Sequence, residues 1–226
     1  MTADRLREVL RPLLKPFASW RFVCAEAAAL DAPARDALAL DEGDRGPLVV
    51  ALFEGRRYRL GDREALQSAT AVKAFLGQVK ERKAEPRFRS EPAPEAPVDA
   101  RGVVTLTGRS FEDFALDESR DALVFFHAPG CAKCHSEVEP LLAQVADKAW
   151  AKGWDKLGVG LARLDVEKND CREEITGLPK VVLYPAVARA RKMEMRAVFP
   201  KTYTLEAMLS FVRLHARNLR GASAEL

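Results

Sequence analysis

Two cysteines separated by two residues, Cys131 and Cys134, are the residues whose types and spacing most clearly suggest chemistry. A thiolate, and not a thiol, attacks a disulfide, so a redox-active cysteine needs a lowered pKa. Cys131 begins a helical pattern, and the unpaired N–H groups and the dipole of a helix N-terminus favour a thiolate. Lys133 adds a nearby cation. The spacing also allows Cys134 to close a disulfide and to resolve a mixed disulfide with a substrate.

A cysteine pair with this spacing has two other interpretations, half of a zinc site and a chance occurrence. A structural zinc ion takes four ligands, so a second Cys or His pair would be needed at a suitable spacing. The remaining cysteines and histidines offer no such pair: Cys24, Cys171, His127, His135 and His215. The strand pattern before the pair and the helical pattern after it favour redox chemistry.

The elements around this pair alternate between strands and helices. Apolar and β-branched runs predict strands at residues 103–107, 122–127, 159–165, 180–184 and 195–199. Periodicity and capping predict helices that begin after Ser110 and that cover residues 131–145, 170–175 and 205–212. The continuous apolar run at 122–127 is typical of a strand covered on both faces. This order predicts an α/β fold.

The first part of the chain repeats only the end of that order. Helices are predicted at residues 6–14, 32–40 and 71–79, and strands at 20–25, 48–53 and 57–60. Because the first strand, helix and strand are missing, we expect an incomplete domain. Its missing piece would belong to an absent N-terminal segment, which makes the chain a fragment, or a partner subunit would cover its open face.

A proline-rich stretch separates the two parts. Four of the 13 prolines, at positions 86, 92, 94 and 97, fall here among acidic residues. Proline fixes φ and favours extended polyproline II, so this stretch predicts a semi-rigid linker. We therefore predict domains at residues 1–85 and 101–220, joined by a linker at 86–100.

The composition excludes several classes of protein. A net charge of +3, from 36 basic and 33 acidic residues, is too small and dispersed to indicate a nucleic-acid partner. No apolar run approaches the ~20 residues of a membrane-spanning helix, so no membrane span is predicted. The start of the chain lacks the apolar core of a signal peptide. Four cysteines in 226 residues are too few for a disulfide-scaffolded miniprotein.

Several segments occur in an order that resembles a known family. They are VVTLTGRSF at 103–111, LVFFHAPGCAKC at 123–134, ARLD at 162–165 and GLPK at 177–180. Together they resemble a catalytic thioredoxin-like domain (a′) of the protein disulfide isomerases. FRSEPAPE at 88–95 resembles the junction before that domain, and residues 1–85 resemble the second half of a non-catalytic b′ domain.

The resemblance implies two thioredoxin-like domains, each a central mixed β-sheet flanked by helices, the first N-terminally incomplete. Cys131 would be the nucleophile and Cys134 the resolving cysteine. The peptide bond before Pro179 would be cis and face the site, and by analogy the bond before Pro47 would be cis too.

The family also implies partners and a location. Its substrates are unfolded or partly oxidised client proteins, and glutathione is a further candidate. The redox-active disulfide is the only redox group needed, so no organic cofactor or metal is expected. The family works in the endoplasmic reticulum lumen, although this chain has neither a signal peptide nor a KDEL-type ending.

The sequence departs from the family at the site. Gly130 stands where a tryptophan is usual, Phe125 where a buried glutamate accepts the proton of the second cysteine, and Arg163 where a lysine is usual. Ala132 and Lys133 replace Gly-His, Tyr203 matches a mobile arginine (with Lys201 nearby), and Pro140 lies one residue later than usual.

These departures lead to a hypothesis of a competent but inefficient oxidoreductase, weak at isomerisation. Without a proton acceptor, Cys134 should attack a mixed disulfide slowly. Arg163 and Lys133, with no compensating acid, should favour the Cys131 thiolate and so a more oxidising disulfide. The alternative is a chaperone-like or complex-forming module of the same family with an attenuated redox site.

The remaining candidates receive simpler interpretations. We expect His127 to pack at the edge of the core, with a role beside Cys131 as the alternative. We expect His135 to be a solvated helix residue. Cys24 and Cys171 are interpreted as buried free thiols, because unpaired cysteines are among the most buried residues, and a bridge between them is the alternative.

Overall fold

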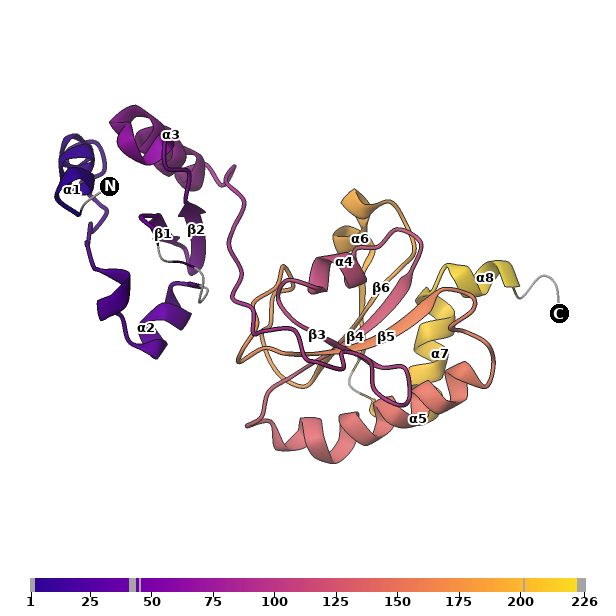
Figure 1. Ribbon diagram of the computed structural model, residues 1–226. Coiled ribbons are helices and arrows are strands. Elements are labelled where there is room, and N and C mark those ends of the chain that lie inside the picture. Colours follow the sequence, from indigo (N-terminus) through magenta and orange to yellow (C-terminus); the bar gives the residue numbers. More distant parts are fainter. Residues whose placement is uncertain (1–2, 41–43, 45, 201, 223–226) are drawn as a thin grey trace. The chain divides into compact units, whose positions relative to one another are not determined.

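The computed structural model describes residues 3–40, 44, 46–200 and 202–222, and it divides into two compact units, residues 1–89 and 90–226 (Figure 1). No helix in these ranges is long and apolar enough to cross a membrane. The cysteine pair lies in the second unit. Of the linker predicted at 86–100, residues from 90 onward belong to the second unit, where Asn169 accepts from the N–H of Glu91 (3.0 Å) and donates to its carboxylate (2.7 Å).

The second unit is built on a five-stranded mixed sheet in the order β3-β5-β4-β6-β7. The strands β3, β5 and β4 are parallel, whereas β6 and β7 run antiparallel to their neighbours. Their bounds are β3 Val104–Leu106, β4 Asp121–His127, β5 Val159–Asp165, β6 Lys180–Tyr184 and β7 Ala197–Val198. The apolar run of β4 therefore lies at the centre of the sheet, with its first six residues buried.

Helices cover both faces of this sheet (Figure 1). Leu123 and Phe125 pack in the core with α5 (Glu139–Trp150) and α7 (Leu205–His215). Residues 122, 124 and 126 pack in a second core with α4 (Phe111–Ala115) and the edge of α6 (Arg189–Met195). Burial on both faces explains why β4 is continuously apolar. The helix α8 (Asn218–Ala222) follows α7.

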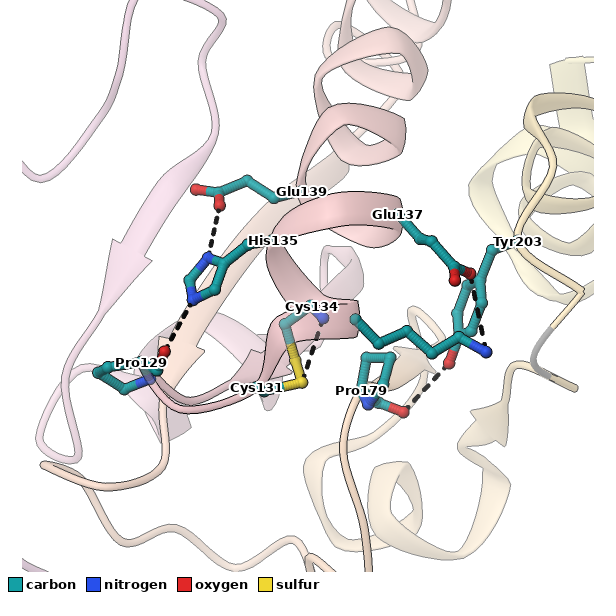
Figure 2. Close-up of a disulfide and its surroundings, with 9 residues drawn as sticks. Pro129, Cys131, Cys134, His135, Glu137, Glu139, Pro179 and Tyr203 are labelled. Atoms are coloured by element: carbon teal, nitrogen blue, oxygen red, sulfur yellow. Dashed lines mark hydrogen bonds and ion pairs between the residues drawn. A yellow bond between two sulfur atoms is a disulfide. The ribbon is translucent and has the colours of Figure 1, made fainter.

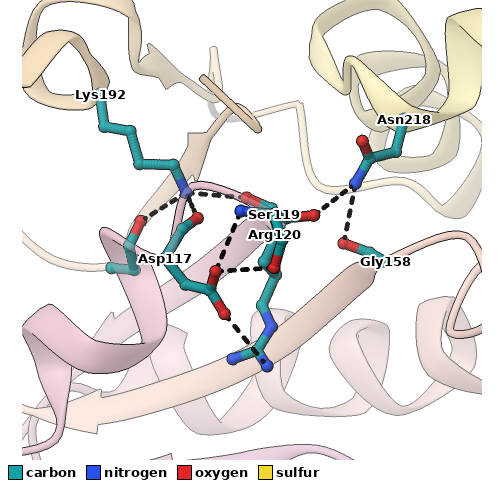
Figure 3. Close-up of polar contacts among 7 residues, drawn as sticks. Asp117, Ser119, Arg120, Gly158, Lys192 and Asn218 are labelled. Atoms are coloured by element: carbon teal, nitrogen blue, oxygen red, sulfur yellow. Dashed lines mark hydrogen bonds and ion pairs between the residues drawn. The ribbon is translucent and has the colours of Figure 1, made fainter. Parts of the chain in front are cut away.

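A buried polar network anchors the amino end of β4. The fully buried Lys192 donates to the carbonyls of Ala115 (3.1 Å), Asp117 and Arg120 (2.7 Å). Nearby, Asn218 donates to the carbonyl of Ser119 (Figure 3). These bonds tie α6 and α8 to the turn that enters β4.

Asp121, the first residue of β4, adds to this anchoring. Its buried carboxylate accepts from the backbone N–H groups of Ala186 (2.7 Å), Arg217 (2.9 Å) and Asn218 (2.8 Å). Burial lowers the pKa of Lys192 to about 8, so the ammonium with its three donors still predominates at pH 7. The strand that leads to the cysteines is thus fixed at its start.

The first unit contains a smaller sheet, in which β1 (Val49–Phe53) pairs with β2 (Arg56–Leu60) in antiparallel fashion. Its helices are α1 Ala3–Leu10, α2 Ala32–Ala37 and α3 Ala69–Lys80, with 3-10 turns at Arg11–Leu13, Ala27–Ala29 and Ala65–Gln67. Buried residues of α1, α3 and the two strands, with Leu13 and Phe17, form its core.

Three local expectations are wrong, and two helices were not predicted. The predicted strand at 20–25 is absent, and Trp20 instead stacks on Phe53, with ring centroids 5.5 Å apart. The described sheet of this unit therefore consists of β1 and β2. Residues 170–175 form no helix, whereas α6 and α8 were not predicted. Among the described residues the one cis bond precedes Pro179, so the expectation for Pro47 is wrong.

Candidate redox site

Cys131 and Cys134 form a disulfide where the chain leaves the loop after β4 and enters the helix that continues as α5. Their sulfur atoms are 2.15 Å apart and their Cα atoms 5.2 Å apart. Cys134 is fully buried in the core under α5, whereas Cys131 is partly exposed. The backbone N–H of Cys134 donates to the sulfur of Cys131 at 3.1 Å (Figure 2). A partner from solution can therefore reach Cys131, with Cys134 beneath it.

A π-helical turn, Cys134–Val138, begins at the second cysteine and precedes α5. The N–H of Glu139 donates to the carbonyl of Cys134, five residues earlier. One extra residue in a helix is absorbed by such a turn, and Pro140 follows it within the first turn of α5. Pro140 thus lies where its missing N–H costs no helical hydrogen bond.

Pro179 lies beside the disulfide and is buried, with a cis bond before it (Figure 2). The hydroxyl of Tyr203, which comes just before α7, donates to the carbonyl of Pro179 at 3.1 Å. Burial raises the pKa of Tyr203, so the phenol keeps its proton at neutral pH. Tyr203 therefore holds the Pro179 loop. Lys201, the other residue expected near this position, lies outside the described residues.

The cations expected to favour the Cys131 thiolate both have acidic partners. Lys133 pairs with Glu137 at 3.7 Å, and its ammonium also lies 5.2 Å from the centre of the Tyr203 ring. Arg163 pairs with Glu139 at 3.5 Å and donates to the hydroxyl of Thr105 at 3.1 Å. The expectation of cations with no compensating acid is therefore wrong. The i,i+4 spacing of Lys133 and Glu137 could have revealed the first pair.

Phe125 occupies the buried position expected for a proton acceptor. Its side chain is 2% exposed and belongs to the same core as Cys134, and it pairs in register with Arg163 on β5. His127 stacks on Phe125, with ring centroids 5.4 Å apart. Burial lowers the pKa of His127, which favours the neutral imidazole. His127 thus packs at the core edge on the same face of β4 as Phe125.

His135, expected to be a solvated helix residue, makes two specific contacts. Its Nδ1 lies 3.1 Å from Glu139 Oε2, and its Nε2 lies 3.1 Å from the carbonyl oxygen of Pro129 (Figure 2). The bond to Glu139, followed by the bond to Pro129, raises the pKa of His135. Sequence reasoning missed both partners, although His135 and Glu139 are also at i,i+4 spacing.

Gly130, just before Cys131, is exposed and leaves the rim of the site open. A Cβ atom there would meet a carboxylate oxygen of Glu167 at 3.7 Å, an ordinary contact distance. Crowding at the Cβ position therefore does not require a glycine there.

The other two cysteines are free. Cys24 is exposed, so the expectation of a buried thiol is wrong for it. Cys171 is partly buried, and burial raises the pKa of its thiol to about 12. Cys171 is therefore an inert thiol at neutral pH. In the described part of the chain, no three His, Cys, Asp or Glu side chains lie close enough to hold a metal ion.

A buried carboxylate that the sequence did not reveal contacts Lys180, the residue after Pro179. Glu173 accepts from the ammonium of Lys180 (2.6 Å) and from the hydroxyl of Tyr184 (2.7 Å), and it pairs with Arg196 at 2.7 Å. Two cations and a phenol offset the cost of burying one carboxylate. Because Lys180 follows Pro179 directly, this cluster fixes the loop that faces the disulfide.

Comparison with known proteins gives the following similarities. Residues 102–203 match the family model described as Thioredoxin. A protein disulfide-isomerase of Aspergillus niger is 32% identical over 158 residues, covering 67% of this chain and 28% of that protein. Protein disulfide-isomerase A4 of Bos taurus is 24% identical over 224 residues, covering 97% of this chain and 33% of that protein. The chain thus spans about a third or less of the length of these relatives.

Among solved structures, the first thioredoxin domain of mouse protein disulfide-isomerase A4 superimposes with a TM-score of 0.38 at 18% identity. The superposition covers 55% of this chain and 84% of that domain.

Proposed function

The chain is a thioredoxin-like protein of the protein disulfide isomerase family, and on this premise we propose that it exchanges disulfides with cysteines of client proteins through Cys131 and Cys134. The observation that carries the proposal is the asymmetry of the pair. A partly exposed sulfur accepts a hydrogen bond from the backbone of Cys134, whose own sulfur is fully buried. Such an arrangement separates an attacking from a resolving cysteine.

The oxidised pair would accept two electrons from a client dithiol. A client thiolate attacks the sulfur of Cys131, the bond between Cys131 and Cys134 breaks, and Cys134 leaves as a thiolate that takes up a proton. A second client thiolate then attacks the client sulfur of this mixed disulfide and releases Cys131. The client gains one disulfide, and the enzyme becomes a dithiol. The reverse sequence reduces a client disulfide.

The reverse direction exposes the weakness of this site. Cys134 must lose its proton before it attacks the mixed disulfide, and its buried neighbour Phe125 cannot accept one. We therefore propose slow resolution and weak isomerisation. Because Lys133 and Arg163 are paired with glutamates, we expect less stabilisation of the Cys131 thiolate than two unpaired cations would provide.

The test compares three variants in insulin reduction and in oxidative refolding of a reduced protein. Cys131→Ser should abolish both activities, whereas Cys134→Ser should abolish turnover and accumulate a mixed disulfide at Cys131. Cys171→Ser is the matched control, because this thiol lies outside the site, and it should keep wild-type turnover. Equal turnover by the wild type and by Cys131→Ser would exclude the enzymatic function.

A second function, a chaperone-like or complex-forming module with an attenuated redox site, is favoured by Phe125 at the acceptor position and by the open rim at Gly130. This alternative predicts suppression of client aggregation that Cys131→Ser leaves unchanged.

We further propose unfolded or partly oxidised proteins as substrates, glutathione as a redox partner, and the endoplasmic reticulum lumen as the location. These follow the family, as does a redox cycle that needs no cofactor beyond the disulfide. A partner subunit at the first unit is a separate proposal, which sedimentation of the purified chain would test.

A further inference from the structure

His135 contacts the turn that presents Cys131 and the helix behind it at the same time. Its two ring nitrogens face two acceptors, the carbonyl oxygen of Pro129 and a carboxylate oxygen of Glu139, each at 3.1 Å. A carbonyl and a carboxylate offer no proton, so both contacts are hydrogen bonds only when both nitrogens carry one. The geometry therefore fits the imidazolium and leaves one contact unmatched in the neutral ring.

His135 and its partner Pro129 are both near Cys131 in the sequence. Pro129 is two residues before Cys131, and the backbone N–H of His135 donates to the carbonyl of Cys131 at 3.4 Å. His135 thus connects three segments: α5 through Glu139, the loop after β4 through Pro129, and the first helical turn through the carbonyl of Cys131.

We propose that His135 is a positioning residue for Cys131: as an imidazolium, it holds the Pro129–Cys131 turn to Glu139 and adds a positive charge to the turn that carries the Cys131 thiolate. This inference rests on the proposed function, since it concerns the reduced, attacking form of Cys131. His135 would supply a positive charge that Lys133 does not supply, because Lys133 pairs with Glu137 and faces the ring of Tyr203.

The charged groups around His135 determine its response to pH. Glu139 faces it from α5 and is shared with Arg163 from β5. His127, at the end of β4, is held neutral by burial, and Glu167 lies near Gly130 in the loop after β5. Lys133 and Glu137, on the same helical turn, pair with each other.

The hydrogen bonds of His135 determine how their stabilising contribution changes with pH. They raise the pKa of His135, so their contribution is complete below the pKa of an unfolded histidine and is lost as the pH rises through the folded value.

The first measurement is the NMR titration of His135 in the oxidised and in the reduced protein. Linkage is reciprocal: if the imidazolium favours the Cys131 thiolate, the thiolate must favour the imidazolium by the same factor. The pKa of His135 should therefore be higher in the reduced protein. His215, the last residue of α7, makes none of these contacts, so it is the internal control and should titrate identically in both states. If His135 had only a structural role, its pKa would be the same in the oxidised and the reduced protein, and this result would contradict the proposal.

The second measurement is the alkylation rate of Cys131 from pH 5 to pH 8, resolved from the exposed Cys24 by peptide mass spectrometry. His135→Gln should slow alkylation at pH 6 by about two- to fivefold, the range of exposed charge pairs, and should converge on the wild type at pH 8. His215→Gln should match the wild type throughout.

Two outcomes separate this inference from the proposed function. Identical alkylation profiles and an unchanged His135 titration, in a protein whose disulfide exchange is active and depends on Cys131, would overturn the role of His135 alone. Absence of disulfide exchange in the wild type would overturn the proposed function, and with it the inference that depends on it.

Discussion

The two ends of β4 hold their charged side chains in opposite ways. At the amino end, Lys192 and Asp121 are fully buried, and backbone groups satisfy both of them. At the carboxyl end, the cations Lys133, His135 and Arg163 are partly or largely exposed, and a glutamate of the helix faces each of them. We call the amino end of β4, with its buried and satisfied charges, the fixed end. We call the carboxyl end, with its exposed ion pairs, the adjustable end.

This difference has an energetic meaning. Buried charges are costly to leave unpaired, so the network at the amino end tolerates little change and holds the geometry of the strand. Exposed ion pairs contribute only about 0–1 kcal/mol each, so the pairs beside the disulfide can rearrange at little cost. The redox end thus has charges that bias reactivity without determining the fold.

The largest expected effect is on stability, at the fixed end. Lys192→Met leaves three carbonyls without their donor and should lower the free energy of unfolding of the second unit by about 2–4 kcal/mol. Urea denaturation followed by tryptophan fluorescence measures this change. A loss below 0.5 kcal/mol would contradict the distinction between the two ends.

The next effect is on rate, at the buried neighbour of Cys134. Phe125→Glu introduces a proton acceptor into the core and should accelerate attack on a mixed disulfide by about 10²-fold. The same change should lower stability, because the carboxylate is buried. Stopped-flow release of a thiol from a preformed mixed disulfide measures the rate. Phe125→Leu is the matched control. If Phe125→Glu releases the thiol no faster than Phe125→Leu, the lack of a proton acceptor does not limit the rate.

A smaller effect is expected where Tyr203 holds the Pro179 loop. Tyr203→Phe removes one hydrogen bond and keeps the ring that faces Lys133, so the free energy of unfolding should fall by about 0.5–1.5 kcal/mol. Thermal unfolding by calorimetry detects this loss. Unchanged stability would show that the bond does not restrain the loop.

The smallest effect concerns the exposed pair at the adjustable end. Lys133→Met should change stability by less than about 1 kcal/mol and should slow alkylation of Cys131 slightly. Glu137→Gln breaks the same pair from the other side and should speed alkylation, because it releases the cation. Changes in the same direction would show that the pair acts through structure and not through charge.

Four of the five strands of the second unit were predictable to within about one residue because burial determines their pattern, whereas the strand expected at 195–199 is shortened to β7 and its first residue belongs to α6. The expected strands at 122–127, 159–165 and 180–184 correspond to β4, β5 and β6. The expected strand at 20–25 failed because local pattern does not supply a pairing partner. The position of the cysteines at the strand–helix junction was also predictable, since periodicity changes from strand to helix there.

The sequence by itself determined where the redox cysteines lie and which strand leads to them, because short-range spacing and continuous burial both leave a local signal. Only the tertiary structure decided the electrostatics around them. Glu139 meets Arg163 of the neighbouring strand, and Glu173 becomes a buried partner of Arg196, because helix and sheet packing bring distant positions together. A charge in a sequence has a sign but no partner, and the interaction free energy depends on the partner's distance and burial.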